Sequence, residues 1–277
     1  MRSVPFSSGE RVPALGIGTW RMGEQRARRA EEIATLRLAI ERGASLIDTA
    51  EMYGDGGAEV LIGEAISGRR DEVFLVSKVY PHNASRQAAV EACERSLLRL
   101  RTDRIDLYLL HWRGGVPLGE TVDAFLTLQQ QGKIRYFGVS NCDTSDMREL
   151  WELPGTHAVA TDQVLYNLTR RGIEWELVPW LRERRIPVMA YSPLEEGRLI
   201  GNPALVEFAS RHGLTPAQAA LGWLLAHDDV IAIPKAGSRE RLQENLDTLD
   251  HPLSSAQLRE LERLFPPPAG PLPLEML

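Results

Sequence analysis

Four ionisable side chains follow the ends of three successive apolar runs in the sequence. Asp48 ends the first run and Tyr53 follows in a loop, Lys78 ends the second run, and His111 ends the third. Lys78 lies 30 residues after Asp48, and His111 lies 33 residues after Lys78. One strand–helix–strand unit has a similar length, about 30 residues. Since parallel strands all end at the same edge of a sheet, we expect these four side chains to meet there.

Together these groups suit the protonation of an oxygen that is gaining negative charge. A buried lysine beside a carboxylate stays protonated, and its charge is expected to lower the pKa of a nearby tyrosine from about 10 toward neutrality. Tyr53 would then be a general acid, and His111 would orient a carbonyl oxygen by donating a hydrogen bond. Each residue alone has a structural explanation, as a packed ring, a snorkelling cation or a helix cap. Their placement on adjacent strands favours chemistry in which hydride adds to a carbonyl.

Eight short apolar runs, typical of buried parallel strands, alternate with amphipathic segments along the chain. The runs are Leu15–Thr19, Ser45–Thr49, Val73–Ser77, Asp106–Leu110, Ile134–Val139, Val159–Leu165, Pro187–Tyr191 and Val230–Ile233. Between them, Glu31–Arg42 and Ser85–Leu100 carry apolar residues at helical spacing. Thr215 and Gln218 predict a capping box at the start of a further helix.

This alternation predicts an α/β fold, a closed (β/α)8 TIM barrel, formed by a single domain of residues 1–277. Closure removes both sheet edges, whereas the competing topology, an open doubly wound sheet, keeps them. Residues 1–13 are expected to form an N-terminal β-hairpin over Val4–Val12, with its turn at Ser8-Gly9. Residues 266–277 are rich in proline and are expected to be an extended tail outside the barrel.

The composition argues against several classes of protein. With 32 basic and 38 acidic residues the formal net charge is −6, which disfavours binding nucleic acid through bulk charge. No run approaches the roughly 18 apolar residues of a membrane span. There are only two cysteines, Cys93 and Cys142, and the N-terminal residues lack the pattern of a signal peptide. We therefore expect a cytoplasmic protein, a monomer, with no metal site and no membrane or nucleic-acid partner.

A series of short segments spread over nearly the whole chain matches one known family in order. The segments are Leu15–Trp20, Leu46–Ala50, Tyr53-Gly54, Glu59–Gly63, Ser77–Val79, Ser96-Leu97, Asp106–Trp112, Gly132–Arg135, Gly138–Asn141, Tyr191–Leu194 and Ile233–Lys235. Any one segment is a weak signal, but this order over this much chain is specific. The sequence resembles the aldo-keto reductase family. The resemblance implies an NADP(H)-dependent enzyme that reduces small aldehydes and ketones to alcohols.

The resemblance also implies roles for individual residues. It places Asp48, Tyr53, Lys78 and His111 on the family's catalytic tetrad, with Tyr53 as the proton donor. The implied nicotinamide contacts are Ser140, Asn141 and Gln163 at the amide and Tyr191 stacked on the ring, and the implied pyrophosphate contacts are Ser192 and Leu194. The other implied cofactor contacts are Thr19, Trp20 and Asp48, then Lys235, Ser238 and Arg241 at the adenosine phosphate, and Glu244 and Asn245 at the adenine.

The residues around position 235 favour NADPH over NADH. Ser238 is predicted to cap a helix, helix N-termini attract phosphate, and Lys235 and Arg241 add two cations that a ribose 2′-phosphate would use. A solvated basic turn is the alternative explanation.

Two residues depart from the family's pattern. Ala236 replaces a serine, which would remove one hydroxyl contact to the phosphate, and Asp162 replaces an asparagine.

Three aromatic residues, Trp20, Tyr80 and Trp112, follow strand ends at the same edge and are predicted to wall the substrate pocket. An apolar pocket with one polar corner suits small aldehydes and ketones, although core packing is an alternative for Tyr80. The short tail is expected to leave this pocket open. Arg21 and Arg113 lie beside the two tryptophans and are candidates for attracting a carboxylated or phosphorylated substrate.

The sequence disfavours several other kinds of site and leaves one alternative function open. A Rossmann site is disfavoured because Gly16 and Gly18 are followed by Thr19 and Trp20 and not by the fingerprint's third glycine. The sequence also contains no P-loop and no histidine pair at zinc-ligand spacing. A nicotinamide-nucleotide-binding sensor or regulatory protein with vestigial reductase activity remains the alternative, since the same fold and site would serve it.

Overall fold

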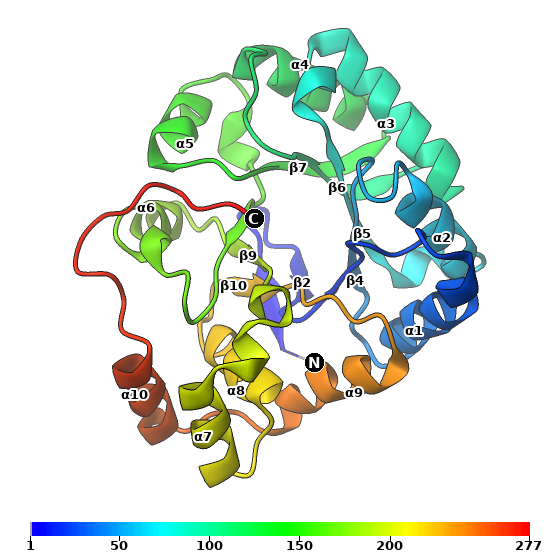
Figure 1. Cartoon of the computed structure of the whole chain (residues 1–277). Coiled ribbons are helices and arrows are strands. Elements are labelled where there is room, and N and C mark those ends of the chain that lie inside the picture. The colour runs from blue at the N-terminus through cyan, green and yellow to red at the C-terminus, as the bar shows by residue number, and fades with distance from the viewer. Residues whose placement is uncertain (1) are drawn as a thin grey trace.

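The computed structural model describes residues 2–277, and eight parallel strands form its centre (Figure 1). The strands are β3 (Ile17–Gly18), β4 (Leu46–Asp48), β5 (Phe74–Val79), β6 (Ile105–Leu110), β7 (Ile134–Ser140), β8 (Asp162–Leu165), β9 (Val188–Tyr191) and β10 (Val230–Ala232). They pair in chain order from β3 to β10. Each of the eight apolar runs in the sequence overlaps one of these strands, as parallel strands buried on both faces require.

The first and last strands are linked, so the sheet closes on itself. A parallel bridge joins Leu15 to Ala232, and a second joins Gly18 to Lys235. Glycine is needed at this seam, because a Cβ on Gly18 would lie 2.9 Å from the carbonyl oxygen of Ile233. The predicted (β/α)8 barrel is thus confirmed, and the open doubly wound sheet is ruled out.

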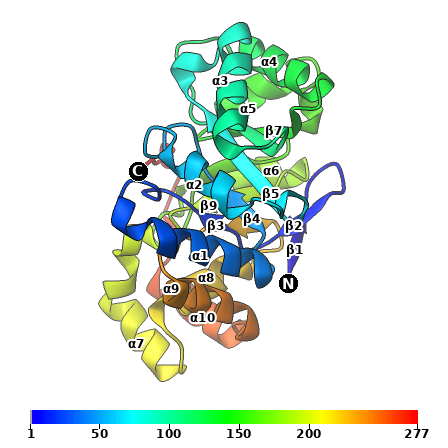
Figure 2. The same cartoon turned by 90° about the vertical axis from the view of Figure 1, so that its right-hand side faces the viewer.

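Helices surround the strands on the outside (Figures 1 and 2). They are α1 (Arg29–Glu41), α2 (Gly57–Ala65), α3 (Arg86–Leu100), α4 (Leu118–Gln130), α5 (Thr144–Trp151), α6 (Leu177–Glu183), α7 (Pro203–Arg211), α8 (Pro216–Leu225), α9 (Arg239–Asp247) and α10 (Ser255–Leu264). The predicted capping box of Thr215 and Gln218 is present at the start of α8. Within residues 2–277, no helix is both long and apolar enough to cross a membrane.

The predicted N-terminal hairpin is present and packs at the N-terminal end of the barrel strands. β1 (Ser3–Pro5) pairs with β2 (Arg11–Pro13), and Val4 lies opposite Val12. Glu10, in the hairpin, pairs at 3.0 Å with Arg135, the second residue of β7. The loops that follow the strands form the opposite end of the barrel, at the C-terminal ends of the strands. Active sites of this architecture lie at that end.

The proline-rich tail contains no helix or strand and runs back across the barrel (Figure 1). Trp175 Nε1 donates to the Pro268 carbonyl at 2.9 Å, and Arg170 pairs with Glu275 at 2.5 Å. At the end of the chain, the Leu277 N–H donates to the hydroxyl oxygen at the end of the Tyr191 ring, at 3.4 Å. The tail therefore reaches Tyr191 at the end of β9, and the expectation that it leaves the substrate pocket open stays a prediction.

Candidate active site

A buried lysine ammonium lies at the centre of the four ionisable residues. Lys78 Nζ donates to the Asp48 carboxylate at 2.8 Å and to the Tyr53 hydroxyl at 3.1 Å. Its third hydrogen bond, also 2.8 Å long, goes to the Thr49 carbonyl. Lys78 is 0% exposed and Asp48 is 2% exposed. All three ammonium protons are used, so the lysine fixes the carboxylate and the phenol relative to one another.

Neighbouring strand ends position these side chains. Asp48 ends β4, Lys78 is the penultimate residue of β5, and His111 directly follows β6. Thr19, just after β3, donates its hydroxyl to the Asp48 carbonyl at 2.9 Å and adds a fourth strand end to the cluster. Tyr53 comes from the loop between β4 and α2. That loop turns back through three consecutive residues in the left-handed region, Gly54, Asp55 and Gly56.

Burial sets the protonation states of this cluster. Burial raises the pKa of Tyr53 and the Lys78 charge lowers it, while the Asp48 charge raises it again. Because burial is the largest effect, the pKa of Tyr53 lies above its ordinary value. Burial alone would lower the pKa of Lys78, but Asp48 and Tyr53 together raise it. The expectation of a Tyr53 pKa shifted toward neutrality is therefore wrong. At neutral pH the tyrosine keeps its proton and the lysine keeps its charge.

His111 is a neutral imidazole beside the phenol. Burial, and secondarily the Lys78 ammonium, lower the pKa of His111 to about 2. Its ring centroid lies 5.8 Å from that of Tyr53, and its buried Nδ1 has no hydrogen-bond partner within residues 2–277. A neutral imidazole carries one N–H, so His111 can donate a single hydrogen bond and brings no positive charge to the site.

Aromatic rings flank the phenol and the imidazole. Trp20 meets the Tyr53 ring edge-on at a centroid distance of 4.9 Å, and Trp112 lies 4.8 Å from His111. Tyr80 packs edge-on against Trp112 at 5.8 Å. The structure therefore places all three predicted pocket residues around the tetrad, and Trp20 remains 37% exposed. An aromatic surface of this kind excludes water from the polar groups beside it.

A chain of hydrogen bonds connects Asp48 to the residues expected at the nicotinamide. Gln163 Nε2 donates to Asp48 Oδ1 at 2.7 Å, and Ser140 Oγ donates to the Gln163 carbonyl at 2.7 Å. Asn141 Nδ2 donates to Ser140 Oγ at 3.1 Å. The Tyr191 hydroxyl donates to Asn141 Oδ1 at 3.0 Å. These four residues, which lie in or directly after β7, β8 and β9, thus form one network with the tetrad.

A buried acid holds the loop after β9 in an uncommon conformation. Ser192, Glu195 and Glu196 have φ angles of 46°, 51° and 54°, in the left-handed region that non-glycine residues rarely adopt. Glu195 is 6% exposed and accepts from Asn167 Nδ2 at 2.8 Å and from Arg170 at 2.7 Å. The sequence gives no signal for these pairings, because the partners lie on different loops. The loop carries the two expected pyrophosphate contacts, Ser192 and Leu194.

Cations gather at the start of α9. The pKa of half-buried Lys235 is lowered by burial and then by the positive charges of Arg28, Arg241 and Arg21. Within residues 2–277, none of these four cations forms an ion pair with a carboxylate. Ser238 caps α9 as predicted. Two expected adenine contacts, Glu244 and Asn245, follow on this helix, and Asn245 is buried.

Two residues singled out in the sequence have surroundings that change their interpretation. Arg113 pairs with Asp146 at 2.8 Å and with Glu149 at 2.6 Å, so its charge is already neutralised and it does not fit the role of a substrate anchor. Asp162 is fully buried, and neither carboxylate oxygen makes a hydrogen bond within residues 2–277. Burial raises the pKa of Asp162 well above its ordinary value, and the negative charges of Asp146 and Asp143 raise it further. Burial therefore favours the protonated, neutral form of Asp162.

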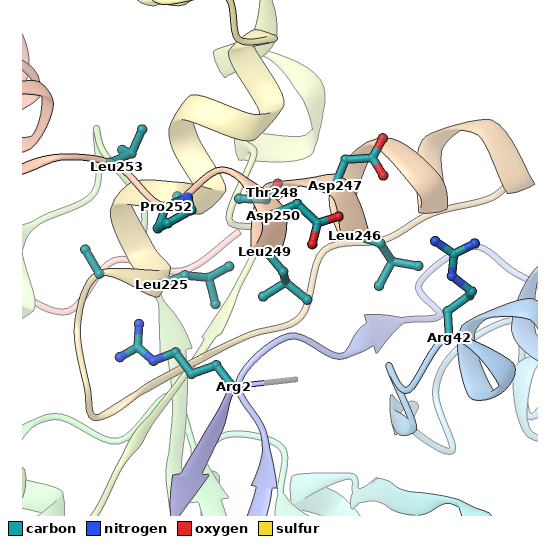
Figure 3. Close-up of a pocket in the computed structure, with 12 residues that line it drawn as sticks. Arg2, Arg42, Leu225, Leu246, Asp247, Thr248, Leu249, Asp250, Pro252 and Leu253 are labelled. Carbon is teal, nitrogen blue, oxygen red and sulfur yellow. The ribbon is translucent and has the colours of Figure 1, made fainter.

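A separate cavity of about 460 Å³ contains none of the predicted site residues (Figure 3). It lies beside the hairpin, where Arg2 pairs with Asp228 at 2.8 Å. Leu225, Leu246 and Leu249 point into this space from the surrounding helices. The cavity is thus distinct from the polar cluster at the C-terminal ends of the strands.

Comparison with known proteins decides the family. Residues 14–265 match the family model described as the aldo/keto reductase family. The chain belongs to the aldo-keto reductase family. The match covers the whole barrel, from the residues before β3 to the end of α10.

Several known reductases are similar to this protein along nearly the full chain. Methylglyoxal reductase YeaE of Escherichia coli (strain K12) is 51% identical over 281 residues, covering 100% of this chain and 99% of that protein. Glyoxal reductase of Bacillus subtilis (strain 168) is 33% identical, covering 99% of this chain and 97% of that protein. A crystal structure of an aldo/keto reductase from Klebsiella pneumoniae in complex with NADP and acetate superposes with a TM-score of 0.96 at 50% identity, covering 100% of this chain and 99% of that chain.

Proposed function

We propose that this aldo-keto reductase catalyses the NADPH-dependent reduction of small aldehydes and ketones to alcohols, with Tyr53 as the proton donor. One observation carries the proposal: the buried Lys78 ammonium is hydrogen-bonded to both the Asp48 carboxylate and the Tyr53 hydroxyl. Such a cation stabilises a phenolate as it forms. Membership of the family and the names of the relatives support catalysis over the alternative of a nucleotide-binding sensor.

The residues divide the chemistry among them. The Tyr53 hydroxyl donates its proton to the carbonyl oxygen as negative charge develops there, and Lys78 stabilises the phenolate that remains. Asp48 keeps Lys78 charged and in place, and His111 aligns the carbonyl by donating a hydrogen bond from its neutral ring. The aromatic residues exclude water, which strengthens each of these interactions. When bound, NADPH supplies the hydride that adds to the carbonyl carbon.

The donor set fits a dinucleotide that carries a 2′-phosphate. Lys235 and Arg28 approach Gly237 just before α9, and Arg241 lies in the first turn of α9. Since none of these three cations pairs with a carboxylate within residues 2–277, a phosphate dianion is the ligand that the set favours. We propose that this end of the site holds the adenosine, with Glu244 and Asn245 at the adenine. We propose that the other end of the site holds the nicotinamide. Its contacts would be Ser140, Asn141, Gln163 and Tyr191, together with Thr19 and Trp20 beside Asp48. Ser192 and Leu194 would contact the pyrophosphate.

We propose small, uncharged α-oxoaldehydes as a substrate class. The relatives described above are named methylglyoxal reductase and glyoxal reductase. The pocket fits small uncharged carbonyls, because aromatic rings flank the phenol and the imidazole. The arginine nearest to Trp112, Arg113, is already paired with two carboxylates, so it offers no free charge to an acidic substrate.

Steady-state turnover tests this proposal. Purified protein is assayed with methylglyoxal, glyoxal, a simple ketone and a carboxylated aldehyde, using NADPH and NADH in parallel. We expect many turnovers, faster with the uncharged dicarbonyls and with NADPH. Oxidation of one equivalent of NADPH without further cycling would instead indicate a sensor.

We also propose that the enzyme acts as a cytoplasmic monomer. Both cysteines are free and buried, which suits a reducing compartment. Light scattering of the purified protein is expected to give a mass near 30.9 kDa. A mass near twice this value would show that the protein is a dimer.

A further inference from the structure

We propose that Arg28 is a specificity-determining residue for the 2′-phosphate of the cofactor and that it compensates for the missing hydroxyl at Ala236. This inference rests on the cofactor site proposed above. Arg28 lies outside the short motifs that carry the resemblance in the sequence, and it lies 209 positions before the residue it contacts. The barrel closes between β3 and β10, and this closure brings the start of α1 next to the start of α9.

A direct hydrogen bond places Arg28 in the phosphate site. It ends the single turn of 3-10 helix, Arg26–Arg28, that leads into α1. Its Nη2 donates to the carbonyl oxygen of Gly237 at 2.9 Å. A Cβ on Gly237 would lie 2.7 Å from that nitrogen and 2.6 Å from Lys235 Nζ. The two cations thus approach the backbone of Gly237 at the same point.

The charges around Gly237 are unfavourable without an anion. Burial lowers the pKa of Lys235 most, and among the neighbouring positive charges Arg28 lowers it most. The nearby acid, Glu32, only partly offsets this and is itself bound to the Gly23 amide at 3.0 Å. Arg29, the next residue in the chain, has a carboxylate partner, since it pairs with Glu64 at 2.6 Å. Two adjacent cations that lack such partners are stabilised when a dianion binds between them.

The contact would replace what Ala236 cannot supply. Ala236 is fully buried and carries no hydrogen-bonding side chain. A guanidinium keeps further N–H groups after one is used by a carbonyl, and its bonds to phosphate are stronger than those of a neutral hydroxyl. The loss of the family's serine therefore does not soften the preference for NADPH when Arg28 is present.

Binding of two adenosine nucleotides tests this role without turnover. Calorimetry measures the Kd of 2′,5′-ADP, which carries the 2′-phosphate, and of ADP, which lacks it. Arg28→Met keeps the side-chain stem and removes the charge. We expect this variant to raise the Kd of 2′,5′-ADP on the order of tenfold to a hundredfold, as for the loss of one charge-assisted hydrogen bond. The Kd of ADP should change less than about threefold. Arg26→Ala is the matched control, because Arg26 is exposed in the same turn, and it should leave both Kd values unchanged.

The other outcomes separate the inference from the proposal on which it rests. Equal weakening of both nucleotides by Arg28→Met, or no weakening, would overturn the role of Arg28. If Lys235→Met weakens 2′,5′-ADP selectively while Arg28→Met does not, the cofactor site is right and only the inference fails. If the wild-type protein does not prefer 2′,5′-ADP to ADP, both fail. If Arg28→Met does not fold, Arg28→Lys replaces it, and an unchanged preference for 2′,5′-ADP over ADP in the lysine variant would contradict a need for the guanidinium.

Discussion

Two buried aspartates at opposite ends of the barrel have similar burial and different partners. Asp48 ends β4 and Asp106 is the second residue of β6, and each is 2% exposed. The oxygens of Asp48 accept from Lys78 and Gln163. Those of Asp106 accept from Arg70 at 2.7 Å, the Leu75 amide at 2.9 Å and Arg135 at 3.0 Å.

The difference lies in the cation and in what that cation touches next. Arg70 also donates to the Thr102 hydroxyl and to the carbonyls of Val73 and Arg104, and a guanidinium keeps its proton at any ordinary pH. The network around Asp106 is therefore closed and holds the strands together. Lys78 instead donates to Tyr53, whose hydroxyl carries a proton that can leave. The same pairing of acid and base thus stabilises the fold at one end and supports proton transfer at the other.

Removing the lysine should produce the largest change, because it affects both activity and stability. We expect Lys78→Met to lower kcat/KM by about a thousandfold, the middle of the range for general acid catalysis. Asp48 would lose its buried partner, so the free energy of unfolding should also fall by about 3–5 kcal/mol. Activity is measured below the melting temperature, and stability by urea denaturation.

Lys78→Arg separates charge from shape at the same position. Only 3 of the 32 basic residues in the chain are lysines, and this one is fully buried. A planar guanidinium does not reproduce three hydrogen bonds from one compact nitrogen. We expect a loss of activity similar to that of Lys78→Met. Turnover within tenfold of the wild type would show that the compact ammonium is not required.

At the other end of the barrel, Asp106→Ala should affect stability and spare the chemistry. We expect a loss of roughly 3 kcal/mol in the free energy of unfolding, at the low end for a broken buried ion pair because both arginines keep some solvent contact. Well below the melting temperature, kcat should stay within twofold of the wild type. Asp123→Ala, which breaks the exposed pair with Arg86, is the control and should cost less than about 1 kcal/mol. A large fall in kcat for Asp106→Ala would contradict the division between the two ends.

Substituting Asp162 should change stability by a smaller amount and should increase it. Because its pKa is raised in the folded protein, the folded state binds a proton more tightly than the unfolded state does, and stability falls as pH rises above about 4. Asp162→Asn removes this dependence. We expect it to stabilise the protein by on the order of 1–3 kcal/mol at pH 7, with the gain shrinking toward pH 4. Thermal denaturation at several pH values measures this, and a gain that is the same at every pH would argue against a raised pKa of Asp162.

Arg113 should show the smallest effect, although it lies next to the active site. Its two carboxylate partners already satisfy the guanidinium. We expect Arg113→Ala to change kcat/KM by less than about twofold for charged and uncharged carbonyls alike, and to cost no more than about 1 kcal/mol of stability. A loss confined to carboxylated substrates would restore the role suggested by its position in the sequence.

The fold was largely predictable because burial on both faces leaves a clear sequence pattern. β5, β6 and β7 each begin or end within two residues of the predicted apolar runs. The run Val159–Leu165 differs at its start, because Thr156–Ala158 forms a turn of 3-10 helix and the strand proper begins at Asp162. The placement of the tetrad followed from the barrel, since strand order fixes which strand ends are neighbours.

What could not be predicted depends on contacts between distant loops. Arg28 and Gly237 meet only because the barrel closes. Leu277 returns to Tyr191 because Glu275 pairs with Arg170 on another loop. The pKa of Tyr53 depends on a balance between burial and two opposite charges, and the sequence gives the charges but not the burial. Local sequence patterns predict the helices and strands, whereas contacts between loops and the burial of a side chain depend on the three-dimensional structure.

Tyr53→Phe tests the central claim most directly, because it removes one oxygen and leaves the Lys78–Asp48 pair intact. Steady-state reduction of the best carbonyl substrate is measured together with the Kd of NADPH by fluorescence titration. We predict a fall in kcat of about a hundredfold to ten-thousandfold with an unchanged Kd, as for loss of a general acid. A kcat within a few-fold of the wild type would contradict the assignment of Tyr53 as the proton donor.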